Sequence, residues 1–193
     1  MSAIEQPIRD LAGLLAELSY REGEFTLASG KTSDFYVDVR QTVMKPAGAL
    51  LIGRLIWQRL EAAGINSVGG MAVGAVPLVT SVLCAAASAN RAEAIDGFFV
   101  RKTAKDHGTA RRIDGRFDAS ARIALVEDVV TTGASTLDAI DAVEEAGGRV
   151  ELVISVVDRE ESEGIGRLSD RVERAEALIT RTMILEAHRR IGA

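Results

Sequence analysis

Residues 122–135 read Arg122-Ile123-Ala124-Leu125-Val126-Glu127-Asp128-Val129-Val130-Thr131-Thr132-Gly133-Ala134-Ser135, and this stretch decides the fold. Its first five residues are mostly apolar and have the length of a buried strand. Residues 134–146 then place Leu137, Ile140 and Val143 on one face of a helix. A buried strand that leads through a short loop into a helix is the building unit of a parallel sheet.

Strands and helices alternate on both sides of this stretch. We expect helices over residues 1–20, 46–63, 76–89 and 134–146, and a helical tail over 185–190. We expect strands over residues 25–27, 35–40, 67–73, 95–100, 122–126 and 150–157, and a candidate edge strand over 175–179. This pattern predicts an α/β fold with a central, mainly parallel sheet flanked by helices. Ligands of such sheets bind beyond the carboxyl ends of the strands, here after residues 73, 100, 126 and 157.

Size and composition indicate one globular domain. The chain has 193 residues, 47% of them apolar, which is enough for one core. Its net charge of -5 disfavours nucleic acid as a partner. We expect a cytoplasmic protein without a membrane segment, because no signal peptide and no apolar run near ~20 residues is present. Cys84 is the single cysteine, and its apolar neighbours favour a core residue over a catalytic thiol.

Between the expected strand and helix, two acids, Glu127 and Asp128, directly precede a loop suited to bind an anion. The free amides of the loop and the positive end of the helix dipole favour a phosphate, and Gly133 permits a close backbone approach. Glu127 and Asp128 would repel a phosphate, but they are good acceptors for a sugar diol and can help hold a hydrated magnesium ion. The segment therefore fits a ribose 5-phosphate. The alternative is an acidic helix entry that only complements the dipole.

Residues 101–112 concentrate positive charge in an acidic protein. The run Arg101-Lys102-Thr103-Ala104-Lys105-Asp106-His107-Gly108-Thr109-Ala110-Arg111-Arg112 holds five fixed cations and a histidine. It has no apolar periodicity, so we expect a loop, with Gly108 and Gly115 letting it bend. A cationic loop beside a phosphate site suits a lid over a pyrophosphate leaving group. The alternative is an ordinary solvated loop.

Three motifs resemble a known family. Residues 126–135 resemble the phosphoribosyl pyrophosphate signature of type I phosphoribosyltransferases, an apolar strand, two acids and a Thr/Gly/Ser loop. The run Arg101-Lys102-x-x-Lys105-Asp106-His107-Gly108 is similar to the catalytic loop of the orotate phosphoribosyltransferases. Phe25-x-Leu27-x-Ser29-Gly30-x-x-Ser33-x-x-Tyr36 resembles the base-binding hood of that family, and Asp158-Arg159-Glu160 resembles its orotate-contacting segment. The resemblance spans residues 20–160.

Two positions depart from the family pattern. Some members carry a base-contacting lysine where this chain has Ala28. Some also carry a lysine in the loop after the second sheet strand, where residues 70–77 offer only backbone groups. We therefore expect the second base contact to come from the backbone of Tyr36 and Val37.

The resemblance implies an enzyme that transfers ribose 5-phosphate from phosphoribosyl pyrophosphate to orotate. The products would be orotidine 5'-monophosphate and pyrophosphate, in the pathway to UMP. It implies Mg²⁺ as cofactor, held through the substrate, and a homodimer that shares loop 101–115 between subunits. It also implies one domain over residues 1–193, with a hood over 1–45, a parallel-sheet core over 46–160 and a tail over 161–193.

The family motifs also imply site residues. Lys105, His107 and Asp128 are expected to be catalytic, and Thr131 and Arg159 are expected to contact orotate. The residues expected to bind phosphoribosyl pyrophosphate are Arg101, Lys102, Lys105, His107, Glu127, Asp128, Val129, Val130, Thr131, Thr132, Gly133, Ala134 and Ser135.

Three other functions fit part of the sequence. A transferase for a purine or another base would share the phosphate loop, but the orotate-type basic loop weighs against it. A transcriptional regulator that senses phosphoribosyl pyrophosphate has no use for a cationic lid and would want a basic nucleic-acid surface. A non-catalytic interaction domain would leave both charged loops without a role.

Overall fold

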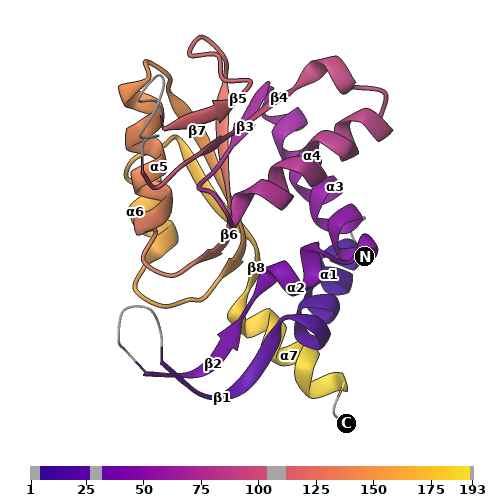
Figure 1. The fold of residues 1–193 in the computed structure, drawn as a ribbon. Coiled ribbons are helices and arrows are strands. Elements are labelled where there is room, and N and C mark those ends of the chain that lie inside the picture. Colours follow the sequence, from indigo (N-terminus) through magenta and orange to yellow (C-terminus); the bar gives the residue numbers. More distant parts are fainter. Residues whose placement is uncertain (1–4, 27–31, 104–111, 192–193) are drawn as a thin grey trace.

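The computed structural model describes residues 5–26, 32–103 and 112–191, and its centre is one six-stranded sheet (Figure 1). The strands lie in the order β5-β4-β3-β6-β7-β8, and the pairs are parallel except for the antiparallel pair of β4 and β5. The strands are β3 (Ser67–Gly69), β4 (Asp96–Val100), β5 (Ile113–Gly115), β6 (Ile123–Val130), β7 (Val150–Asp158) and β8 (Arg174–Thr180). The expected α/β fold with a mainly parallel sheet is confirmed.

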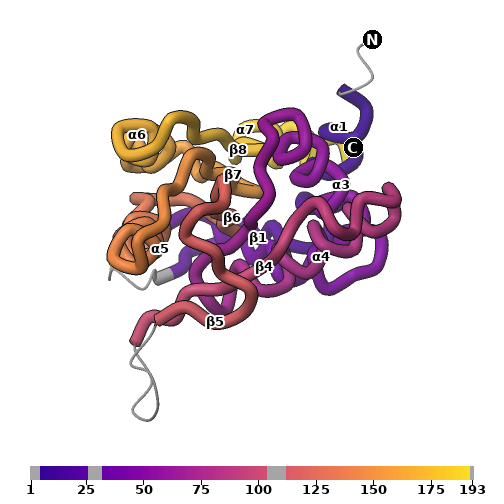
Figure 2. Tube along the Cα trace, turned by 90° about the horizontal axis from the view of Figure 1, so that it is seen from above, coloured from indigo at the N-terminus to yellow at the C-terminus, as the bar shows by residue number. Residues whose placement is uncertain are grey.

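Helices cover both faces of this sheet (Figures 1 and 2). One side carries α1 (Glu5–Leu18), α3 (Pro46–Ala62) and α4 (Ala75–Ser88), and the other carries α5 (Ala134–Glu145) and α6 (Gly164–Ser169). The two layers follow from β6, because successive strand residues point to opposite faces. Ala124 and Val126 pack in the apolar cluster that includes α3 and α4, whereas Ile123 and Leu125 pack in the cluster that includes α5.

A two-stranded antiparallel sheet stands beside the main sheet, formed by β1 (Tyr20–Thr26) and β2 (Thr32–Val37). The strand expected over residues 35–40 ends at Val37 because a short helix, α2 (Val39–Val43), begins there. Asp38 caps this helix by accepting a hydrogen bond from the amide of Arg40 at 3.1 Å. Phe35 and Val37, which alternate with exposed residues along β2, are buried.

Three parts of the main sheet differ from the expected elements. β3 covers only residues 67–69 and not 67–73, and the short antiparallel strand β5 was not predicted. β6 does not end at Val126 but continues to Val130, because its last residues keep pairing with β7. Glu127 and Asp128 therefore lie within a strand rather than after it.

The assignment of Cys84 to the core is wrong. Its side chain is exposed on α4, while the same helix buries Val82, Ala85 and Ala86. The helix is apolar over most of its surface, so the apolar neighbours of the cysteine did not reveal which face it occupies.

The C-terminal segment adds the last strand of the main sheet and a final helix. β8, the candidate edge strand, pairs in parallel with β7 at the edge of the main sheet, so that expectation is confirmed. α7 (Arg181–Ile191) follows directly and packs against α1. A single 3-10 turn, η1 (Ala92–Ala94), precedes β4. Across the described ranges, no helix has the length and apolar character needed to cross a membrane.

Candidate active site

A phosphate-sized pocket lies where β6 passes into α5. Its volume is about 170 Å³, several times the ≈ 30 Å³ that a water molecule occupies in the liquid. The first hydrogen bond of the helix runs from the amide of Leu137 to the carbonyl of Gly133 at 2.9 Å, so the preceding amides have no partner within the helix. The pocket is lined by Glu127, Val129, Val130, Thr131, Thr132, Gly133, Ala134, Ser135 and Thr136.

Two glycines make this loop possible. Gly133 has a φ of +76°, a conformation that residues with a side chain rarely adopt. Gly164, the first residue of α6, lies so close to the loop that a Cβ there would come 2.4 Å from the carbonyl oxygen of Thr131. The start of α6 thus packs directly against the phosphate loop. The sequence analysis assigned no role to this helix.

The two acids of β6 point to different neighbours. Glu127 is 7% exposed and accepts a hydrogen bond from the Thr136 hydroxyl at 2.8 Å. Burial, with the adjacent Asp128 adding to it, raises the pKa of Glu127 from 4.5 to about 8. Asp128 is only half-buried and accepts a hydrogen bond from the amide of Val129 at 2.9 Å. Burial thus favours the neutral form of Glu127, which faces α5, while Asp128 remains the more accessible of the two.

The loop before α4 lies against Asp128. A Cβ placed on Gly74 would sit 3.0 Å from Oδ2 of Asp128, and one on Gly70 would sit 2.3 Å from the carbonyl oxygen of Val126. The absence of side chains at Gly70 and Gly74 lets the backbone of residues 70–74 run close beside Val126 and Asp128 of β6. Asp128 consequently lies between this backbone and the phosphate loop.

The described ends of the basic run are tied together. The amide of Arg101 donates to the carbonyl of Arg112 at 2.8 Å, and Nε of Arg112 donates to the carbonyl of Arg101 at 2.9 Å. The Arg101 side chain forms an ion pair with Asp114 at 2.5 Å. Arg112 binds both carboxylate oxygens of Asp138 on α5, at 2.9 and 2.7 Å. This run is thereby attached to the helix that begins at the phosphate pocket.

The cationic residues within that run are placed only in part. Lys102 is exposed, and its charge helps Arg112 hold the pKa of Asp138 below the usual range, with the Arg112 hydrogen bond as the main cause. Lys105 and His107 lie outside the described residues, as does Ala28 of the hood. Their roles stay predictions.

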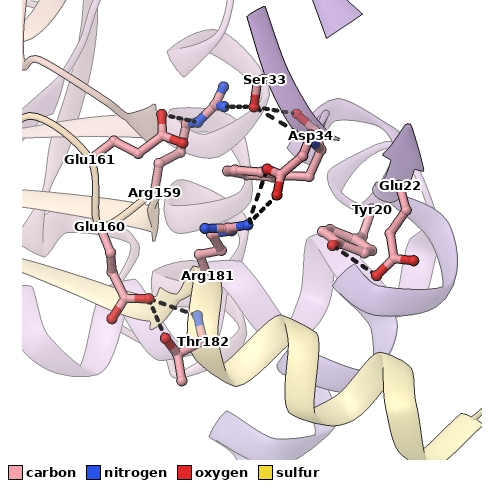
Figure 3. A network of polar contacts seen from close by, with 10 residues as sticks. Tyr20, Glu22, Ser33, Asp34, Arg159, Glu160, Glu161, Arg181 and Thr182 are labelled. Carbon is pink, nitrogen blue, oxygen red and sulfur yellow. Dashed lines mark hydrogen bonds and ion pairs between the residues drawn. The ribbon is translucent and has the colours of Figure 1, made fainter. Parts of the chain in front are cut away.

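Arg159 lies at the same edge of the sheet, directly after β7. Its amide donates to the carbonyl of Val130 at 3.1 Å, which places it beside the start of the phosphate loop and Thr131. Its side chain is 6% exposed, donates to the Ser33 hydroxyl at 3.0 Å and lies 3.4 Å from a carboxylate oxygen of Glu161 (Figure 3). The guanidinium carbon sits 4.4 Å from the centroid of the Phe35 ring. The hood and the sheet thus meet at this arginine.

Sequence reasoning missed three residues of this region. Thr136 is the donor that a buried Glu127 needs, and its position in the first turn of α5 could have signalled it. Phe35 is fully buried beneath Arg159, and only the alternation of β2 pointed to it. Arg181 also lies over Phe35, at 4.0 Å, but it comes from the C-terminal segment and no motif marked it.

The described part of the chain therefore gathers most of the expected residues at one edge of the sheet. Glu127, Asp128, the loop 129–135 and Arg159 lie there, with Arg101 and Lys102 at the end of β4. Within those described residues, no group of three or more His, Cys, Asp or Glu side chains is arranged to hold a metal ion. Of the two acids of β6, Asp128 is the less buried and therefore the more open to a divalent cation.

Comparisons with known proteins agree with this arrangement. No family model matches the chain. Orotate phosphoribosyltransferase from Bradyrhizobium sp. strain BTAi1 is 42% identical over 155 residues, which are 78% of this chain and 83% of that protein. Orotate phosphoribosyltransferase from Mycobacterium tuberculosis H37Rv, in complex with Fe(III) dicitrate, has a TM-score of 0.79 at 35% identity and covers 92% of this chain and 98% of its own. A complex of the M. tuberculosis enzyme with 5-phospho-α-D-ribosyl 1-diphosphate gives 0.73 at 29% identity, covering 93% of this chain and 92% of its own.

Proposed function

Because this chain belongs to the orotate phosphoribosyltransferase family, we propose that it transfers the ribose 5-phosphate unit of phosphoribosyl pyrophosphate to orotate. The products are orotidine 5'-monophosphate and pyrophosphate, which makes the reaction a glycosyltransfer in the synthesis of UMP. The fold is that of the type I phosphoribosyltransferases.

One structural observation supports this function independently of the similarity to known proteins. A phosphate-sized pocket of backbone amides and hydroxyls follows directly on an accessible carboxylate, Asp128, at the same strand end. A ligand with a phosphate at one end and a sugar diol near the other satisfies both. We propose that the 5-phosphate lies in the loop 131–135 and that the ribose hydroxyls face Asp128.

The pyrophosphate is proposed to lie between the backbone of residues 70–74 and the basic run. Breaking its bond to the anomeric carbon builds negative charge on the leaving group and positive charge on the ribose, so positioning and electrostatics are sufficient. Lys102, Lys105 and His107 are proposed to neutralise the leaving group. Arg101 already pairs with Asp114, and we propose that it acts mainly through this attachment.

Orotate is proposed to bind at Arg159 and Thr131. A guanidinium group has five N–H donors, and Arg159 uses one of them on Ser33. Its Nε is buried and forms no hydrogen bond with the described residues, although it lies 3.4 Å from a carboxylate oxygen of Glu161. Donors therefore remain for a planar, anionic base, which a guanidinium fork binds through two parallel hydrogen bonds. The ring nitrogen of orotate then attacks the anomeric carbon from the face opposite the leaving group.

Mg²⁺ is proposed as the cofactor. When bound it neutralises charge on the phosphate oxygens. Because the described residues hold no group of three or more carboxylate, His or Cys side chains arranged for a metal ion, most of the ion's ligands would come from substrate oxygens and water, as Mg²⁺ prefers. The chain's own part is to orient the ribose with Asp128 and to hold the 5-phosphate on the loop amides.

We also propose a cytoplasmic homodimer in which loop 101–115 serves the neighbouring subunit. The exposed apolar side chains Met44, at the end of α2, and Leu50, on the adjoining α3, support a contact surface there.

The test of the proposed function is a direct assay. The protein is mixed with phosphoribosyl pyrophosphate, Mg²⁺ and orotate, and the loss of orotate absorbance is followed. Parallel assays use uracil, hypoxanthine and adenine. Turnover of orotate alone supports the proposal, whereas turnover of another base, or of none, contradicts it.

A further inference from the structure

The C-terminal segment supplies a second arginine to the region where orotate is proposed to bind (Figure 3). Arg181, the first residue of α7, has its guanidinium carbon 4.0 Å from the centroid of the Phe35 ring and donates to Asp34 at 3.2 Å. Arg159 lies over the same ring at 4.4 Å and donates to Ser33 at 3.0 Å. Three consecutive residues of β2 thus contact two guanidinium groups from distant parts of the chain.

Each of the two arginines pairs with an acid, Arg159 with Glu161 and Arg181 with Asp34, and both acids are reached by solvent. The two guanidinium groups repel each other beside one fully buried ring, most strongly on the side of Arg159, whose side chain is only 6% exposed. The acid paired with Arg181, Asp34, has a side chain that is 82% exposed, so solvent screens this ion pair. Nε of Arg181 is buried without a hydrogen-bond partner among the described residues, and Nε of Arg159 has only the ion pair with Glu161 at 3.4 Å. Buried donors left in this way call for an explanation, and a bound ligand is one.

The frame around the two arginines is rigid. The carboxylate of Glu160, next to Arg159, accepts hydrogen bonds from the amide and the hydroxyl of Thr182, next to Arg181, at 2.7 and 2.6 Å. The segment after β7 is therefore fastened to the start of α7. Phe35 is held by both arginines, so a change at Arg181 reaches Arg159 through the ring.

We propose that Arg181 is a positioning residue for recognition of the base. It fixes Phe35 and the β2 residues beside it, which keeps the Arg159 guanidinium facing the base, and its own charge favours an anionic planar base over a neutral one. This inference rests on the proposed function and adds to it a role for residues 174–191, which the sequence motifs did not cover.

The test compares Arg181→Gln and Arg181→Lys with the wild-type protein. Arg149→Gln is the matched control, because Arg149 is an exposed arginine paired with the exposed Glu173. We expect Arg181→Gln to raise KM for orotate about tenfold, between the effects of an exposed and a desolvated cation–π contact because the Arg181 side chain is 28% exposed, and to leave KM for phosphoribosyl pyrophosphate within about twofold. Arg181→Lys keeps the charge but not the planar fork, so it should recover part of the loss, to about threefold.

A second variant tests whether Arg181 acts on Arg159 through the Phe35 ring. In a Phe35→Leu background, Arg181→Gln should add little further increase in KM for orotate, because the shared ring is already gone. Thermal unfolding of each variant separates this effect from simple destabilisation. An unchanged KM for orotate in Arg181→Gln, or an equal rise in KM for both substrates, would overturn the proposal. Full additivity in the double variant would do the same.

These outcomes are distinct from a failure of the proposed function. If the wild-type protein does not convert orotate, the function itself is wrong. If it converts orotate and Arg181→Gln behaves like the Arg149 control, the function stands and only the role of Arg181 is wrong.

Discussion

At the scale of single residues, the contrast between Glu127 and Asp128 governs the site. They are neighbours on a strand and close enough that Asp128 helps burial to raise the pKa of Glu127, yet their other surroundings differ. Glu127 is enclosed against Thr136 of α5, while Asp128 stays accessible beside Gly74. The accessible carboxylate can face a developing positive charge. The enclosed one is better suited to fix the start of α5, and with it the phosphate loop.

The raised pKa of Glu127 predicts a pH-dependent stability. Its pKa is 4.5 in its ordinary state and about 8 in the fold, so between these values the unfolded chain has released a proton that the folded chain keeps. Folding stability therefore falls as pH rises through this window, by up to about 1.4 kcal/mol per pH unit. Glu127→Gln retains an acceptor for Thr136 and cannot ionise.

Urea denaturation at pH 5.5, 6.5 and 7.5 measures this effect. The free energy of unfolding of Glu127→Gln should become larger relative to that of the wild-type protein at each step upward in pH, because only the wild-type protein loses stability. Parallel curves for the two proteins would show that Glu127 is already ionised in the fold.

Lys105 carries the largest expected effect on turnover. If it neutralises the departing pyrophosphate, Lys105→Ala should lower kcat about 100-fold, as loss of one transition-state donor does. KM should change much less, because the contact strengthens as charge develops. Lys45→Ala, at an exposed lysine before α3, is the control. Steady-state kinetics with near-normal turnover in Lys105→Ala would remove the basic run from the mechanism.

At the scale of elements, the phosphate loop depends on one backbone conformation. Gly133 combines a φ of +76° with a Cβ position 3.2 Å from the carbonyl oxygen of Gly164. Gly133→Ala should destabilise the fold by about 1–2 kcal/mol, the cost of a left-handed residue with a side chain. It should also weaken binding of phosphoribosyl pyrophosphate, because α6 and the loop must separate.

Gly166→Ala provides the comparison within α6. A Cβ at Gly166 meets nothing within 4 Å, so this change should leave binding intact and slightly stabilise the helix. Denaturation curves and calorimetric titration with phosphoribosyl pyrophosphate check both variants. Equal affinities for the two would mean that the left-handed turn at Gly133 is not required for the site.

The sequence predicted elements with strong apolar periodicity, such as α5 and β7, to within a residue or two. It failed where tertiary contacts decide. β6 continues past Val126 because it keeps pairing with β7 and because Glu127 is enclosed against Thr136. Both contacts are with residues outside the strand, so the local sequence does not indicate the extension. Arg181 could not be found either, since its contact with Phe35 joins residues far apart in the chain. The sequence therefore predicts motifs with fixed spacing, but it does not predict contacts between residues that are far apart in the chain.

At the scale of the whole molecule, the question is which subunit completes each active site. Arg112 binds Asp138 on α5 and thereby fastens the end of the basic run to the phosphate-binding helix of its own subunit. A homodimer with two-fold symmetry has two basic runs and two pockets, so each run could serve either the pocket of its own subunit or that of the partner. The proposed sharing requires that Lys105 of one subunit serve the Asp128 pocket of the other. Light scattering during size exclusion should first give the mass of a dimer.

Subunit mixing then decides the arrangement. Lys105→Ala and Asp128→Asn are each prepared separately, and each alone should be nearly inactive. If the run acts across subunits, each mixed dimer has one pocket with both residues intact and one with neither. Random reassortment of two-fold dimers would then restore about one quarter of wild-type activity. If the run acts within its own subunit, every pocket in the mixture keeps one defect and activity stays at the level of the parents. Mixing each variant with itself under the same conditions is the control, because any recovery there would come from refolding and not from complementation.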